Sequence, residues 1–219
     1  IGFTSPHIIL EPEPKNTTAA ITVGALYAKN INLTQPLLVL PSDHYIENTK
    51  EFVDLVHRTS KSNITNKLIC FGIQPTSPEE KYGYILKKDI DEDRSLLKKI
   101  NKFVEKPSVL KAKNLILRNA LWNSGMFFFN ADSVINEVKF QSPLIYKNSK
   151  LALDKAIPDM DFIRLDAKSF KKITSISIDH AVFEKANNSY VVPTSLNWND
   201  LGTYNALWDI GKKDKYNNV

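Results

Sequence analysis

The chain has 219 residues, of which 42% are hydrophobic and 24% are charged, a composition typical of a globular protein and unlike a disordered or fibrous one. Its formal net charge is +5, but the lysines are scattered in pairs such as Lys87-Lys88, without the interleaved aromatic residues of a nucleic-acid-binding stripe. The single cysteine, Cys70, excludes an intrachain disulfide, and no apolar run reaches membrane-spanning length. We therefore expect a cytoplasmic protein that binds neither nucleic acid nor membrane.

The first third of the chain alternates strand and helix patterns, which predicts a right-handed parallel α/β sheet. The expected elements are a strand at Pro6–Leu10, a helix at Thr17–Lys29 capped by Asn16, a buried strand at Leu37–Leu40 ended by Pro41, a helix opened by Asn48 or Thr49, and a buried strand at Lys67–Ile73.

The rest of the chain mixes strand patterns with helix patterns. We expect strands at Tyr82–Leu86, Ile100–Glu105, Trp122–Phe129 and Ser189–Pro193, and helices at Ser108–Leu117, Ala131–Phe140, Pro143–Ala156, Pro158–Leu165, Ser177–Lys185 and Thr203–Ile210. The acidic segment Asp89–Asp93 lacks the glycine turn of a calcium loop, so we interpret it as a hairpin end. No repeat or linker interrupts the sequence, which predicts one domain over residues 1–219.

Several polar residues follow the predicted strands, at the edge of an α/β sheet where ligands bind. Asp43 lies just past Leu37–Leu40, although its position also suits the capping of a turn. Two carboxylates, Asp43 and Asp200, would suit Mg²⁺ held together with substrate phosphates, but their spacing does not show that they meet. Glu105-Lys106 is equally consistent with a surface pair, and Asn123 with a satisfied buried amide. The sequence contains no Cys/His metal cluster, Gly-x-Ser-x-Gly elbow or Walker loop.

Eight stretches that run collinearly along the chain together resemble the bacterial mannose-1-phosphate guanylyltransferases, a branch of the sugar-phosphate nucleotidyltransferases. They are Glu11–Thr17 with Ala19–Ile21, Leu40–His44, Phe71–Thr76, Tyr82–Ile85, Phe103–Pro107, Trp122–Phe127, Ser177–Lys185 and Trp198–Gly202. The strings at Trp122–Phe127 and Ser177–Lys185 favour the guanylyl branch over the uridylyl and thymidylyl branches.

The resemblance implies a Rossmann-like α/β nucleotidyltransferase fold of the GT-A type, with a mostly parallel mixed sheet flanked by helices. It implies transfer of GMP from GTP to mannose 1-phosphate, giving GDP-mannose and pyrophosphate in nucleotide-sugar biosynthesis. The implied catalytic residues are Asp43, Lys106 and Asp200, with Asp43 and Asp200 as Mg²⁺ ligands and Lys106 at the sugar phosphate; Glu11, Asn16 and Thr17 would bind the nucleotide, and Gly83, Glu105 and Asn123 the sugar. Glu184 and Lys185 are further candidates.

The chain also departs from the family pattern. Lys15, Ala19 and Tyr204 stand where the family usually has arginine, proline and tryptophan. The family's opening strand, its Gly-x-Gly-x-Arg loop that holds the triphosphate, and the cupin isomerase domain of bifunctional relatives do not occur in this sequence, so we expect an N-terminally truncated, partial domain. The alternative function is an inactive sugar-nucleotide-binding or vestigial domain.

The resemblance implies that the family's opening strand would lie beside Leu37–Leu40. Without that strand, Leu37–Leu40 would have unpaired backbone groups along one edge. We therefore expect Ile8–Leu10 to pair there, or two copies of the chain to form a homodimer, or a partner to supply the segment.

Overall fold

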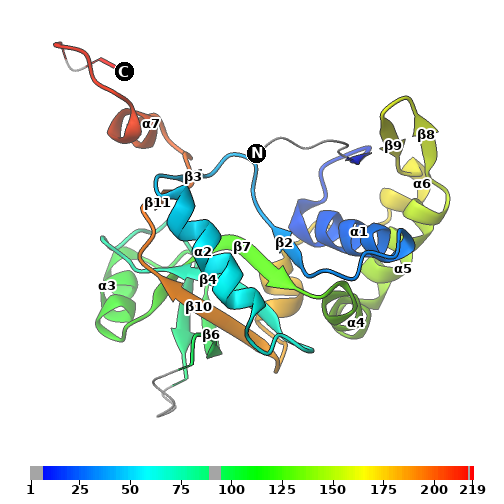
Figure 1. The fold of residues 1–219 in the computed structure, drawn as a ribbon, viewed down its shortest axis with the longest axis horizontal. Coiled ribbons are helices and arrows are strands. Elements are labelled where there is room, and N and C mark those ends of the chain that lie inside the picture. The colour runs from blue at the N-terminus through cyan, green and yellow to red at the C-terminus, as the bar shows by residue number, and fades with distance from the viewer. Residues whose placement is uncertain (1–6, 89–94, 217) are drawn as a thin grey trace. The chain divides into compact units, whose positions relative to one another are not determined.

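The computed structural model describes residues 7–88, 95–216 and 218–219 (Figure 1). The chain divides into two compact units. Unit 1 contains residues up to 37 together with 65–68 and 128–189, and unit 2 contains 38–64, 69–127 and 190–219. Each unit is built from segments far apart in sequence. The single domain over residues 1–219 stays a prediction.

Unit 1 is a group of packed helices. Helices α1 (Asn16–Asn30), α4 (Ala131–Gln141) and α5 (Pro143–Asp154) pack against one another, which confirms three predicted helices (Figure 1). Close packing of α1 follows from its small side chains, since Ala19 and Ala25 are fully buried. Helix α6 (Ala167–Phe170) contacts α5.

The segment predicted as a helix at Ser177–Lys185 forms a shorter π-helix, η1 (Asp179–Phe183), which contacts α4. Ile178 occupies the N-cap position of η1, and the Ser177 hydroxyl before it accepts a 3.4 Å hydrogen bond from the backbone N–H of His180. Single π-turns of this kind are rare and occur frequently at functional sites.

Unit 1 also contains a three-stranded sheet in the order β1-β9-β8. Strand β1 (Ile8–Leu10) pairs in parallel with β9 (Phe162–Arg164), which pairs antiparallel with β8 (Ile157–Asp159). The helix predicted at Pro158–Leu165 is therefore wrong. Its local pattern suited a helix, but Met160 has a φ of +52°, which makes a hairpin turn, and β1 offers β9 a pairing edge that no local pattern shows.

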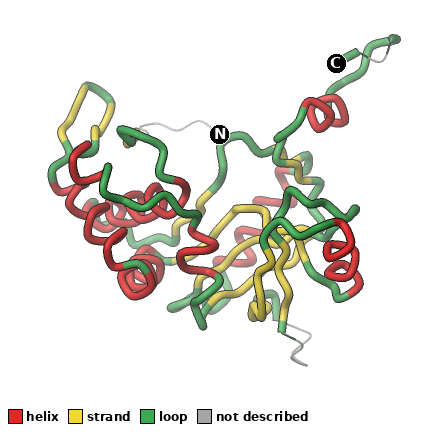
Figure 2. Tube along the Cα trace, turned by 180° about the vertical axis from the view of Figure 1, so that it is seen from behind, coloured by secondary structure: helices red, strands yellow, loops and turns green. Residues whose placement is uncertain are grey.

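Unit 2 is organised around a six-stranded sheet (Figure 2). The strand order is β2-β7-β4-β10-β6-β5, and β7 also pairs with β5. The strands are β2 (Leu37–Val39), β4 (Leu68–Ile73), β5 (Tyr84–Lys87), β6 (Lys98–Val104), β7 (Leu121–Phe129) and β10 (Ser189–Thr194). Strand β4 is buried along its whole length, as its apolar run predicts. The antiparallel β5–β6 pair confirms the predicted hairpin, whose acidic end at Asp89–Asp93 lies outside the described residues.

Strand β2 forms where a strand was predicted, but it is more exposed than predicted. It lies at one edge of the six-stranded sheet, and Leu38 is 36% exposed and Leu40 47% exposed, so the prediction of a buried strand is wrong. The expectation that Ile8–Leu10 pairs beside it is also wrong, because that strand pairs with β9. Pairing of two copies at this edge stays a prediction.

Three helices and a ribbon complete unit 2. Helix α2 (Thr49–Ser60) is capped by Asn48, whose side chain accepts from the Glu51 N–H at 3.1 Å, and its Phe52 ring contacts Phe71 of β4. Helices α3 (Val109–Leu117) and α7 (Tyr204–Ile210) are as predicted. Strands β3 (Tyr45–Ile46) and β11 (Trp198–Asn199) form a two-stranded ribbon. No helix among the described residues is long and apolar enough to cross a membrane.

Candidate functional site

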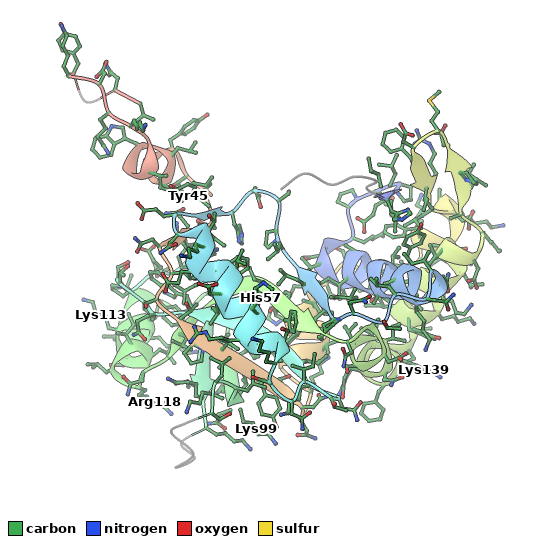
Figure 3. All side chains as sticks on the ribbon, viewed as in Figure 1. Tyr45, His57, Lys99, Lys113, Arg118 and Lys139 are labelled. Carbon is green, nitrogen blue, oxygen red and sulfur yellow. The ribbon has the colours of Figure 1, made fainter. Side chains whose placement is uncertain are left out.

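The ribbon of β3 and β11 brings two distant polar segments of unit 2 together. The strands are antiparallel, with Trp198 opposite Ile46 and Asn199 opposite Tyr45. The next positions along this register are Asp200 and His44, so the segment after the predicted strand at Leu37–Leu40 meets the polar loop near the end of the chain. Figure 3 labels Tyr45 at this ribbon.

His44 occupies the middle of this meeting point. Trp198 donates its indole N–H to His44 Nδ1 at 3.1 Å, and the two rings lie edge to face with centroids 5.2 Å apart. Burial lowers the pKa of His44, while the negative charges of Asp43 and Asp200 oppose this shift. Both predicted magnesium ligands therefore lie within electrostatic reach of one histidine.

Asp200 is held by three donors. The Tyr82 hydroxyl donates to its Oδ1 at 2.9 Å, the Gly202 N–H at 3.3 Å and the Lys81 ammonium at 3.4 Å. Burial alone would raise the pKa of Asp200, but hydrogen bonds from Tyr82 and Gly202 and the charge of Lys81 outweigh it and lower that pKa. Burial, with the hydrogen bond to Asp200, raises the pKa of Tyr82 to about 12, against the opposing effect of Lys81. Asp200 is thus an ionised carboxylate with a fixed orientation.

Asp43 and Asp200 match the ligand chemistry of Mg²⁺. Both offer hard carboxylate oxygens, and no donor among the described residues hydrogen-bonds to Asp200 Oδ2, which leaves that oxygen available. In the described part of the chain, no three His, Cys, Asp or Glu side chains are placed so that they could hold a metal ion together. Mg²⁺ commonly binds through one or two carboxylates plus water and substrate phosphates, so this donor set fits that ion and not a closed, all-protein metal cage.

The three predicted sugar-binding residues meet at Gly83. Its carbonyl accepts a 2.8 Å hydrogen bond from the Asn123 N–H, and a Cβ built on Gly83 would lie 2.7 Å from Glu105 Oε2 and 3.5 Å from Asn123 Cβ. The cause is the strand register, because β5 lies between β6 and the start of β7 at this point. Gly83 also follows Tyr82 directly, so one dipeptide joins this cluster to the Asp200 carboxylate.

Lys106 adjoins the same cluster. Its ammonium lies 3.7 Å from Glu105 Oε1 and its side chain is 67% exposed, so the pair is loose. Lys106 has a φ of +40° and Leu201, beside Asp200, has a φ of +51°. Left-handed backbone at residues other than glycine is costly and concentrates at functional sites, which supports the placement of both loops there.

The predicted nucleotide-binding residues lie in unit 1. The Thr17 hydroxyl accepts a 2.9 Å hydrogen bond from the Ile178 N–H and so ties the start of α1 to the segment before η1. Asn16 has a φ of +63°, and its carboxamide oxygen accepts from the Thr17 N–H at 2.8 Å. In the structure, helix α1 begins at Asn16 and Lys15 occupies the N-cap position, which corrects the prediction of Asn16 as the cap. Partial burial raises the pKa of Glu11.

Of the further candidates, Glu184 lies at the end of η1, and its carboxylate pairs with His180 Nδ1 at 2.6 Å. The two residues are four positions apart in sequence, and both lie in unit 1. The structure therefore brings the predicted metal and sugar residues together in unit 2 and places the predicted nucleotide residues in unit 1.

A pocket of about 400 Å³ in unit 2 is lined in part by Trp198 of this site and by Trp122, the residue before Asn123. Amide and hydroxyl groups of Gln74, Thr76 and Asn197 contribute to its lining. The Trp122 indole N–H is buried and has no hydrogen-bond partner among the described residues. The pocket is thus lined by polar, aromatic and aliphatic side chains.

Sequence reasoning missed the residues that orient Asp200 and the histidine near it. Tyr82 and Lys81 contact Asp200, and Trp198 bonds to His44. Tyr82 and Trp198 belong to family strings, which could have drawn attention to them, but the contact between Tyr82 and Asp200 joins positions 118 apart in sequence and leaves no local signal.

The labelled basic residues of unit 2 lie away from this site. Lys99, Lys113 and Arg118 extend from β6, from α3 and from the turn after it (Figure 3).

The comparison with protein families decides the relationship. The family model described as nucleotidyl transferase matches residues 3–217. The chain belongs to the nucleotidyl transferase family. The α/β fold with mixed sheets, predicted from the resemblance, is confirmed.

Within the nucleotidyl transferase family, the chain is similar to proteins named mannose-1-phosphate guanylyltransferase, which confirms the predicted resemblance. It is 41% identical to one from Salmonella montevideo, over 100% of this chain and 47% of the relative, and 38% identical to one from Escherichia coli, over 97% and 47%. The chain thus spans about half the length of the curated relatives it matches.

Among solved structures, the chain is similar to a Thermus thermophilus protein described as a mannose-1-phosphate geranyltransferase. The TM-score is 0.80 and the identity 27%, over 94% of this chain and 58% of that one. Another structural neighbour, from Helicobacter pylori, is described as a mannose-6-phosphate isomerase, with a TM-score of 0.77 and 28% identity over 89% and 74% of the two chains.

Proposed function

We propose that this chain carries the nucleotidyl transfer site of a mannose-1-phosphate guanylyltransferase. The reaction is GTP plus mannose 1-phosphate giving GDP-mannose and pyrophosphate. The observation that carries the proposal is the Tyr82-Gly83 dipeptide, which joins the hydroxyl that orients Asp200 to the glycine that meets Glu105 and Asn123. This link supports a site in which Asp200, one of the two proposed Mg²⁺ ligands, lies next to the proposed sugar-binding residues, as transfer to a sugar phosphate requires. The similarity to named guanylyltransferases supports the choice of base and sugar.

In the proposed mechanism, a phosphate oxygen of mannose 1-phosphate attacks the α-phosphorus of GTP, and the bond from that phosphorus to pyrophosphate breaks. The protein contributes position and charge and forms no covalent intermediate. Asp43 and Asp200 would hold Mg²⁺, which supplies positive charge to the phosphate oxygens when bound. Tyr82, Lys81 and the Gly202 N–H keep Asp200 ionised and correctly oriented.

The remaining groups select and place the substrates. Glu105 would accept hydrogen bonds from sugar hydroxyls and Asn123 would hold the same sugar, while Gly83 leaves room for its close approach. Lys106, an exposed ammonium beside Glu105, would attract the sugar phosphate as a point charge. In unit 1, Glu11, Asn16 and Thr17 would contact the base and ribose. The Thr17 hydroxyl oxygen accepts from the Ile178 N–H, so its O–H would be the group that donates to the nucleotide.

Calorimetric titration of GDP-mannose, with and without magnesium, tests the site. Asp43→Asn and Asp200→Asn keep the side-chain shape but remove a hard anionic ligand, so each should weaken the magnesium-dependent part of binding by at least about 10-fold. Asp54→Asn, on an exposed position of α2, is the matched control and should bind as wild type.

Two results would contradict the proposal. One is the absence of GDP-mannose binding by the wild-type chain at millimolar ligand. The other is equal binding by all four proteins with magnesium present. A parallel assay of pyrophosphate release from GTP and mannose 1-phosphate reports whether the bound state turns over.

A further inference from the structure

A buried indole and a half-buried imidazole in unit 2 share a hydrogen bond whose direction chemistry fixes. Trp198 Nε1 lies 3.1 Å from His44 Nδ1. An indole nitrogen is a donor only, so His44 Nδ1 must supply a lone pair. The proton of the neutral ring is then on Nε2.

The ring is held in place from two directions. The β3–β11 register puts Trp198 beside the segment that carries His44, and the two rings meet at an interplanar angle of 79°. His44 Cε1, the carbon bonded to Nε2, lies 3.8 Å from the position of a Cβ built on Gly125 of β7. Gly125 is two residues beyond Asn123, so this edge of the ring lies near the strand that carries the sugar cluster. No described residue accepts a hydrogen bond from Nε2.

We propose that His44 donates its Nε2–H to a phosphate oxygen of the bound sugar nucleotide, and that Trp198 is a positioning residue that fixes the tautomer required. The inference rests on the proposed function, which brings a phosphate to Asp43 and Asp200, the two carboxylates whose charges act on His44. A phosphate that binds near two carboxylates needs a hydrogen-bond donor to offset the repulsion between anions. The His44 Nε2–H is such a donor, and the ring that carries it is neutral. In this tautomer His44 neither ligates a metal through Nδ1 nor acts as a base through Nε2.

Long-range ¹H–¹⁵N correlation spectra of the wild-type chain test the tautomer without any ligand. The chain has four histidines, and the His44→Gln spectrum identifies the signals that belong to His44. We expect a pyridine-like Nδ1 and a pyrrole-like Nε2 at neutral pH. Trp198→Phe keeps an aromatic ring but removes the donor, so His44 should become a mixture of tautomers. Trp208→Phe, the same change at an exposed tryptophan of α7, should leave the His44 signals unchanged.

Titration of GDP-mannose with magnesium tests the phosphate contact. Glutamine can place an N–H where His44 Nε2 lies, whereas asparagine reaches only as far as Nδ1. His44→Gln should therefore bind within about 3-fold of wild type, and His44→Asn about 10- to 100-fold more weakly, the range for a lost hydrogen bond to a charged group. His57→Asn is the matched control, since His57 is exposed on α2 (Figure 3). Circular dichroism and thermal unfolding check that each variant folds.

The outcomes separate this inference from the function on which it rests. A wild-type chain that binds no GDP-mannose overturns the proposed function and the phosphate contact together. A wild-type chain that binds, with His44→Asn binding equally well, overturns the phosphate contact alone. A pyrrole-like Nδ1 at His44 overturns the role of Trp198, whatever the binding result. If Asn and Gln variants weaken binding equally, the Nε2–H is not the group that matters.

Discussion

Removal of one hydroxyl group, Tyr82→Phe, tests how Asp200 is held. The lost interaction is the 2.9 Å hydrogen bond to Asp200 Oδ1. A hydrogen bond to a charged group contributes about 1.5–3 kcal/mol. Asp200 keeps its contacts with Lys81 and the Gly202 N–H and its side chain is 24% exposed, so the lower end applies. We expect Tyr82→Phe to lower the free energy of unfolding by about 1.5 kcal/mol at pH 7.

The pH dependence identifies the carboxylate as the partner. The pKa of Asp200 in the folded chain lies below its ordinary value of 3.8, so its ionised form stabilises the fold above that pH. The stabilisation is lost as the pH falls through the folded-state pKa, because the carboxyl is then protonated in both states. The effect of Tyr82→Phe should therefore be largest at neutral pH and shrink as the pH falls below 3.8 and through the folded-state pKa of Asp200.

Tyr84→Phe provides the matched control. The Tyr84 hydroxyl donates to the Glu79 carbonyl at 3.0 Å and accepts from the Glu79 N–H at 2.9 Å, and these backbone groups do not titrate. Urea unfolding of wild type and both variants at several pH values measures the effect. The loss in Tyr84→Phe should be independent of pH. If Tyr82→Phe loses the same stability at neutral and acidic pH, or none at neutral pH, the assignment of Tyr82 to Asp200 is wrong.

Three glycine substitutions test the backbone geometry. Gly83→Ala should weaken GDP-mannose binding by at least about 10-fold in calorimetry, because its Cβ would lie 2.7 Å from Glu105 Oε2 and displace that carboxylate; unchanged affinity would show that Glu105 does not hold the sugar. Gly24→Ala, in α1 with nothing within 4 Å of its Cβ, should raise the free energy of unfolding by about 0.5–1 kcal/mol in urea, and a loss would mean that the helix is packed more tightly there. Gly125→Ala has space but a φ of +68°, so it should cost about 1–2 kcal/mol in the same assay, and a neutral result would show that the backbone there relaxes.

The sequence was sufficient where local pattern and final environment agree. The apolar run at Lys67–Ile73 predicts a buried strand, and β4 is buried at every position. The run at Leu37–Leu40 looks the same but forms an edge strand with exposed leucines, because burial depends on neighbours that a local window does not contain. Pro158–Leu165 failed for a related reason: pairing with β1, about 150 residues away, outweighed the local helical pattern.

The site shows the same division. Asp43, Asp200, Gly83, Glu105 and Asn123 were named from family strings, since each string carries its own residue type at a strand end. The groups that orient them could not be named, because their partners meet only after folding. Trp198 reaches His44 across 154 positions of sequence, through the pairing of two strands of two residues each. Strands of two residues carry no sequence pattern from which their pairing partner could be predicted.

Because the segments of the two units alternate along the sequence, neither unit can be completed early in translation. The polypeptide passes from one unit to the other five times, at residues 37/38, 64/65, 68/69, 127/128 and 189/190. Unit 1 lacks part of its helical layer until residue 189 has emerged, and unit 2 lacks β11 and Asp200 until later still. Domains generally fold as units during synthesis, the N-terminal one first. Neither unit is contiguous in sequence, so the apolar strands β4 and β7 are translated before either unit is complete.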